Sequence, residues 1–168
     1  MHFPLHPETP EEGIRIEELF AGRDLDLDAM YQRMKALMDA EGLPYGQRTR
    51  TYNSRLAQEL GKWADTQPQG GAIHEALYKA YFVDGKNIGD VEVLVEIAAG
   101  VGLPADAARA VLAERSFKAE VDADWSKSRA YGITGVPTFV AGGYGVVGAQ
   151  PYETLENLLN HVQQAGQR

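Results

Sequence analysis

The sequence predicts a fold of mixed helix and strand, either an α+β domain or an α/β sheet that lacks a piece. Apolar residues recur at helical spacing through most of residues 27–131. Two short β-type runs, at 136–140 and 144–147, follow near the end of the chain and are separated by Ala141-Gly142-Gly143. Since an isolated two-stranded hairpin is marginal in water, we expect these strands to belong to a larger sheet.

In the first third of the chain, the sequence predicts one long helix. Prolines at positions 4, 7 and 10 prevent a helix near the start, and residues 16–20 form one helical turn at most. Residues 27–38 carry apolar side chains at helical spacing, with Asp24 or Asp26 as the cap and Gly42 and Pro44 at the end. Residues 46–50 form a polar, basic loop.

The middle and the end of the chain predict further helices around the hairpin. Each shows apolar residues three or four positions apart, and most have a capping residue, a glycine or a proline at an end. One helix begins near Asn53 or Ser54, and a second runs through residues 73–81. The next two follow Asp90 and Pro104, another spans 117–131, and the last follows Pro151.

Composition and charge narrow the class of protein. The 168 residues are 44% hydrophobic and 24% charged, which is typical of one folded domain with room for a second small lobe. Sixteen Lys and Arg against 24 Asp and Glu give a net charge of −8, so a phosphate backbone would be repelled and nucleic acid is not an expected partner.

The sequence contains no cysteine. This excludes, for these residues, a disulfide framework, a thiolate metal site, a cysteine nucleophile and a self-contained dithiol centre. We find no signal peptide, and the apolar stretch 91–101 is interrupted by Glu92 and Glu96, so no membrane association is expected. The expected location is the cytoplasm.

Several short motifs resemble functional sites but lack the required context. Residues 143–148 match G-x-G-x-x-G, yet they lie in a hairpin and do not open a helix, so we interpret the glycines as turn and strand-end residues. His74-Glu75 lacks the second histidine of a zinc helix, because position 78 is Tyr78. No serine has the G-x-S-x-G context. We therefore predict no catalytic residue, metal or cofactor.

Residues 135–140 (GVPTFV) place a proline at the start of a strand. Proline cannot donate to the strand ladder, so it is tolerated there on an edge strand or where a cis bond turns the chain. From the residues alone, an ordinary trans bond is the expected form.

Residues 132–140 (GITGVPTFV), with Tyr144 and 147–151 (VGAQP), resemble the C-terminal part of DsbA-family thioredoxin-fold proteins. The most similar branch is the FrnE-like one, which comprises cytosolic dithiol–disulfide oxidoreductases or isomerases. Three other regions resemble the same branch: 3–7 (FPLHP), 53–57 (NSRLA), and 74–82 (HEALYKAYF) with 88–90 (IGD).

This resemblance implies an incomplete thioredoxin-like fold with a large all-helical insert. Residues 1–15 would be a remnant of a strand and a linker, 16–115 the insert, and 116–168 a C-terminal α-β-β-α part. Family members carry C-x-x-C in a β-α unit before the F-x-L-H-P segment, and this chain lacks that unit. We therefore expect a truncated protein that is redox-inactive as given.

The resemblance also implies a substrate site. In the family the Val-Pro bond is cis and exposes the backbone groups of the preceding residue, which matches Val136 and Pro137 here, with Thr134 beside them. Asn53 and Tyr81 belong to the insert, which overhangs the groove in the family. The expected partner is a protein or peptide thiol or disulfide substrate.

The resemblance further predicts a bare sheet edge beside residues 136–140, and hence a homodimer through that edge. Two other functions stay open: a non-catalytic peptide-binding thioredoxin-like module, and a glutathione-dependent isomerase or kappa-class transferase. Residues 148–151 (GAQP) favour the DsbA branch over the glutathione-dependent one.

Overall fold

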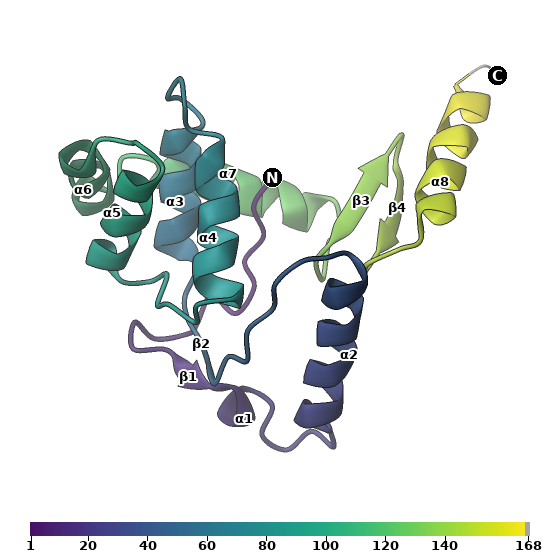
Figure 1. Cartoon of the computed structure of the whole chain (residues 1–168). Helices are drawn as coiled ribbons and strands as arrows, with labels where there is room; N and C mark the ends of the chain where they lie inside the picture. Colours follow the sequence, from purple (N-terminus) through teal and green to yellow (C-terminus); the bar gives the residue numbers. More distant parts are fainter. Residues whose placement is uncertain (167–168) are drawn as a thin grey trace. The chain divides into compact units, whose positions relative to one another are not determined.

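The computed structural model describes residues 1–166 (Figure 1). Helices and short strands follow one another in the order β1 (Ile14–Arg15), α1 (Ile16–Leu19), α2 (Leu27–Ala40), β2 (Arg50–Thr51), α3 (Arg55–Ala64), α4 (Ala72–Phe82), α5 (Val91–Gly100), α6 (Ala105–Glu114), α7 (Lys118–Ala130), β3 (Thr138–Ala141), β4 (Tyr144–Val147) and α8 (Tyr152–Ala165). The expected mixture of helix and strand is confirmed.

The chain divides into two compact units. The larger unit comprises residues 6–121, and the smaller one comprises residues 1–5 together with the chain from Asp122 onward. Among the described residues, no helix is both long and apolar enough to cross a lipid bilayer.

The core of the larger unit lies among α3, α4, α5 and α6. Leu60, Ile73, Leu94 and Leu112, one from each of these helices, are at most 2% exposed. Each belongs to an apolar stripe that the sequence predicted, because side chains three or four positions apart share one helix face. Asp90 caps α5 as expected, and its carboxylate accepts hydrogen bonds from the backbone N–H groups of the first turn.

Residues 1–13 form turns and extended chain, and the first strand is only the pair Ile14–Arg15. That pair is antiparallel to β2, with Ile14 opposite Thr51, a pairing that the sequence did not indicate. Side chains fasten the preceding segment: Asn87 Nδ2 donates to the carbonyl of Glu11, and Arg50 Nη1 donates to two further carbonyls at residues 12 and 13.

The smaller unit contains the predicted hairpin, in which β3 and β4 pair antiparallel from Thr138 opposite Val147 to Ala141 opposite Tyr144 (Figure 1). The two turn residues Gly142 and Gly143 have φ of +55° and +84°, a region that glycine adopts without a steric penalty. The G-x-G-x-x-G run therefore forms a turn and a strand, as expected. Within residues 1–166, this sheet has two strands.

Candidate functional site

The candidate site is the proline turn, residues 135–138, between α7 and β3. The peptide bond between Val136 and Pro137 is cis. Two hydrogen bonds fix the turn: Thr138 Oγ1 donates to the carbonyl of Gly135 at 2.6 Å, and the backbone N–H of Gly148 donates to the carbonyl of Pro137 at 2.8 Å. The second bond ties the turn to the segment that follows β4, so the hairpin positions the turn.

Val136 is well exposed in the proline turn. Its relative exposure is 51%, and Thr134 and Pro137 are exposed as well. Within the described part of the chain, the N–H and C=O groups of Val136 form no hydrogen bond. One donor, one acceptor and an apolar side chain are thus available to an extended polypeptide, which can pair with them as an added strand does.

The hairpin surface beside the turn is apolar. Phe139 and Val140 on β3 are 39% and 44% exposed, and Tyr144 and Val147 on β4 are 47% and 55% exposed. Tyr144 packs at a right angle to the ring of His161 on α8, with ring centroids 4.5 Å apart. The turn therefore leads into a surface that could bury apolar side chains of a bound chain.

Asn53 belongs to the larger unit, and its side chain is fully engaged there. Its Nδ2 donates to the carbonyls of Pro7 at 3.0 Å and Thr9 at 2.9 Å, and its Oδ1 accepts from the backbone N–H of Arg55 at 2.9 Å. Both amide hydrogens and the oxygen are used in these contacts. The observed role of Asn53 is to fasten the N-terminal segment to the start of α3.

Tyr81 is also in the larger unit, within a polar and aromatic cluster. Its hydroxyl and Thr51 Oγ1 are 2.9 Å apart and share a hydrogen bond. The guanidinium of Arg48 lies 4.2 Å from the centroid of the Tyr81 ring and 5.0 Å from that of Phe82. Arg48 Nη1 is buried and has no hydrogen-bond partner among the described residues. The sequence indicated only a basic loop at this place.

Sequence reasoning missed a buried ion-pair cluster around Glu59. The carboxylate, 1% exposed, accepts hydrogen bonds from Arg55 Nε at 2.6 Å and from Arg115 Nε and Nη2, both at 2.7 Å. Burial alone would raise the pKa of Glu59, but hydrogen bonds from Arg115 and Arg55 and their positive charges outweigh it. The pKa lies below the usual glutamate value, so Glu59 is ionised at neutral pH and links α3 to the end of α6. The Arg55-Glu59 spacing of four was the available signal.

Histidine and carboxylate side chains do not gather into a metal site in the described residues. His74 instead pairs with Asp65, with 2.7 Å between Nε2 and Oδ1, on the surface of the larger unit.

Comparisons with known proteins give a consistent result. A family model described as a DSBA-like thioredoxin domain matches residues 1–160. The crystal structure of a "probable DsbA oxidoreductase", SCO1869 of Streptomyces coelicolor, is similar with a TM-score of 0.80 and 33% identity, covering 96% of this chain and 72% of that one. The cytosolic disulfide reductase DsbM of Pseudomonas aeruginosa shares the fold, with a TM-score of 0.51, 22% identity, and coverage of 77% and 75%.

Among curated proteins, the uncharacterized protein YwbO of Bacillus subtilis (strain 168) is 30% identical over 111 residues. The match covers 64% of this chain and 54% of YwbO, so the chain spans about half the length of this relative.

Proposed function

The chain belongs to the DSBA-like thioredoxin domain family, and from that premise we propose that its proline turn holds a protein or peptide substrate of thiol–disulfide exchange. The observation that carries the proposal is the backbone of Val136, whose donor and acceptor have no partner in the described chain although the turn around them is fixed. A substrate strand would take up both groups.

The chemistry proposed for these 168 residues is substrate binding without electron transfer. Thiol–disulfide exchange requires a thiolate that attacks a disulfide sulfur, and the sequence contains no cysteine. We therefore expect no oxidase, reductase or isomerase activity from this chain by itself. In an insulin-reduction assay with dithiothreitol, the rate with the purified chain should equal the uncatalysed rate, and a reproducible acceleration would contradict this part of the proposal.

Binding at the proline turn can be tested by NMR. The ¹⁵N-labelled chain is titrated with S-carboxymethylated insulin B chain, an extended polypeptide that cannot exchange disulfides. We expect the amide of Val136 to shift and to gain protection from solvent exchange, because its N–H acquires an acceptor.

Two matched variants decide whether the turn is responsible. Val136→Asp places a charge beside the unpaired backbone groups, whereas Leu159→Asp places the same charge at an equally exposed apolar position on α8. We expect the first variant to weaken binding and the second to retain it. Equal effects of the two variants, or shifts confined to residues outside 134–138, would contradict the proposal.

The proposal extends to the branch of the family, the compartment and the assembly. The segments that resemble FrnE-like proteins support that branch, whose members are cytosolic, and cell fractionation tests the location. The exposed apolar residues of β3 and β4 support self-association through the hairpin edge. We interpret residues 16–115 as the helical insert and the chain from 116 as the thioredoxin-like part.

A further inference from the structure

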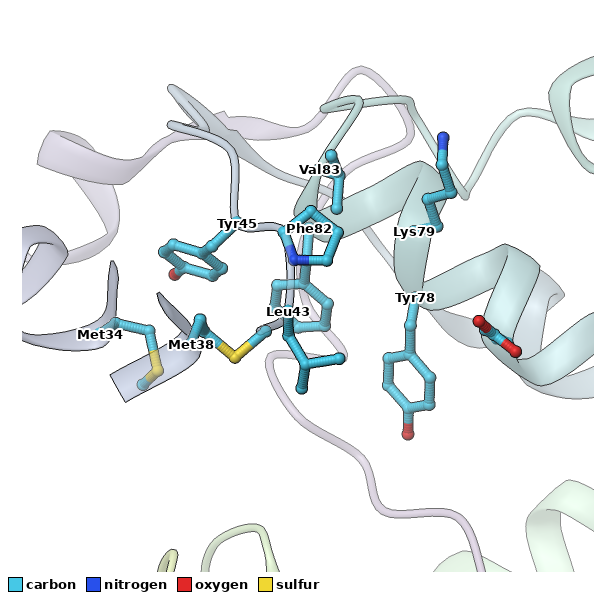
Figure 2. A pocket seen from close by; sticks show the side chains of 10 residues that line it. Met34, Met38, Leu43, Tyr45, Tyr78, Lys79, Phe82 and Val83 are labelled. Atoms are coloured by element: carbon cyan, nitrogen blue, oxygen red, sulfur yellow. The ribbon is translucent and has the colours of Figure 1, made fainter. Parts of the chain in front are cut away.

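We infer that the larger unit carries a second binding site: the α2–α4 groove binds a polypeptide segment with an apolar face and basic residues. Met34 and Met38 of α2, Leu43 of the following loop, and Tyr78 and Phe82 of α4 line this groove, which encloses about 480 Å³ (Figure 2). The inference goes beyond the proposed function, because every lining residue lies within residues 6–121 and none belongs to the proline turn.

The apolar face of α2 is only partly covered, although Tyr31 stacks on Tyr45. None of the residues of this helix is buried, although its apolar side chains follow helical spacing. Met30, Met34 and Leu37 are 46%, 44% and 52% exposed. The stripe continues to Met38, and at 1.5 Å per residue the eight steps from Met30 to Met38 span about 12 Å. An exposed apolar row of this length along a helix suits a polypeptide segment better than a small molecule.

Stacked aromatic rings form one wall of the groove. Tyr45 stacks between Tyr31 at 5.8 Å and Phe82 at 6.5 Å, and Tyr78 stacks on Phe82 at 6.0 Å between ring centroids. Figure 2 shows the two methionine side chains on the opposite side of Leu43 from Tyr78. Methionine is flexible and polarizable, so this second wall can adapt to different apolar side chains against the aromatic wall.

The charges at the groove favour a basic partner. Lys79 is compensated by Asp84, with 3.1 Å between Nζ and Oδ2, and Lys35 of α2 by Asp39 at 2.7 Å. Glu75 lines the groove and forms no ion pair within residues 1–166.

Glu41 is a second unpaired acid. It is the C-cap residue of α2 and follows Met38 by three positions, so it lies at the end of the helix that carries both methionines. It also forms no ion pair in the described chain. The guanidinium of Arg48, 5.0 Å from the centroid of the Phe82 ring, is a cation without an ion pair there, so the two carboxylates outnumber it near the groove. A lysine or arginine of the partner would complement these two carboxylates.

The same observations disfavour the other possible occupants. Tyr78 is 66% exposed, so the groove is open on one side, whereas small-molecule sites bury most of their ligand. A second copy of this chain would bring the same acidic groups, Glu41 and Glu75, to the contact. An apolar segment with basic residues complements both the apolar lining of the groove and its unpaired carboxylates.

The test uses the whole chain and a fluorescein-labelled amphipathic peptide of leucine and lysine, followed by anisotropy. Met34→Glu should weaken binding at least about tenfold, because it removes an apolar contact and forces a carboxylate against the apolar face of the peptide, where it loses its hydration. Ala36→Glu is the matched control, since it adds the same charge to the opposite face of the same helix and should have little effect. Met34→Gln, a neutral variant of similar length, should also weaken binding and guards against a folding defect, which circular dichroism detects.

A charge variant tests the choice of partner. Glu75→Gln should weaken binding of the leucine–lysine peptide by about two- to fivefold and reduce its salt dependence. The same variant should leave binding of a leucine–glutamine peptide unchanged.

The inference is overturned if Met34→Glu and Ala36→Glu bind the peptide equally, or if a small apolar dye occupies the groove while the peptide does not bind. It is also overturned if the peptide does not bind and sedimentation shows an oligomer that only Met34→Glu dissociates, because the occupant is then a second copy of the chain.

Discussion

The substitution Glu59→Gln tests the buried ion-pair cluster of the larger unit. It keeps the size of the side chain but removes its charge, and it directs an amide N–H₂ toward guanidinium groups that can only donate. Three hydrogen bonds from Arg55 and Arg115 to the carboxylate, at 2.6–2.7 Å, are weakened or lost. The two arginines remain close together without the negative charge between them.

The expected loss in the free energy of unfolding depends on how deeply the ion-pair cluster is buried. Removing one partner of a buried ion pair costs about 3–5 kcal/mol. Glu59 is 1% exposed and Arg55 14%, whereas Arg115 is 40% exposed, so water can still solvate one of the two arginines. We therefore expect a loss near the lower end, about 3 kcal/mol in the free energy of unfolding. With a typical dependence on urea, the midpoint falls by about 1–2 M.

Glu92→Gln provides a matched control for this experiment. Glu92 also pairs with an arginine, Arg109, through contacts of 2.7 and 3.0 Å, but it is 66% exposed. Water solvates both partners of this pair, so the midpoint should stay close to that of the unsubstituted chain. Urea unfolding followed by helical circular dichroism compares the two variants. If Glu59→Gln shifts the midpoint no more than Glu92→Gln does, the argument from burial is refuted.

The pH dependence supplies a second readout for the Glu59 cluster. The pKa of Glu59 in the folded chain is below its usual value, which is about 4.3 in an unfolded chain. The stabilisation is therefore complete above about pH 4.3 and is lost as the pH falls through the folded-state pKa. The stability difference between the unsubstituted chain and Glu59→Gln should be constant near neutral pH and shrink in acid. A difference that grows in acid would contradict the assignment.

Three further outcomes are expected. Gly70→Ala should destabilise the chain strongly, because the added Cβ would collide with the backbone carbonyl of Ala64 at the end of α3. In Gly71→Ala the added Cβ meets no atom within 4 Å, so this control should be tolerated, and thermal melts compare the two variants. Asn53→Ala should lower the free energy of unfolding by about 1–2 kcal/mol and speed hydrogen exchange in residues 7–13, and unchanged exchange would refute its fastening role. Phe139→Lys should reduce any self-association through β3 in light scattering, and an unaltered oligomer would exclude that edge.

The sequence could predict those features that depend on neighbours along the chain. Apolar spacing predicted the helices that became α2 to α8, and the carboxylates of Asp26 and Asp90 cap α2 and α5 as their positions indicated. The glycine pair before Tyr144 predicted the hairpin turn. Periodicity and caps act over one or two turns, so they are readable without knowing where the rest of the chain lies.

The proline turn shows the limit of such local reasoning. The residues alone favoured a trans bond at Val136-Pro137, the resemblance to a family indicated cis, and the bond in the structure is cis. What the residues around the turn did not reveal is its closure by Gly148, eleven positions further along, because that contact forms only when β4 folds back onto β3.

What the sequence by itself determined is therefore the set of helices, the hairpin and the family of the chain, since each is encoded by short segments. Only the tertiary structure decided that the Asn53 amide binds carbonyls 44 and 46 positions away, that Arg115 reaches Glu59 across 56 positions, and that much of the apolar face of α2 stays exposed. These outcomes depend on which helices pack together. A helical repeat specifies that a face is apolar, but not which surface, if any, will cover it.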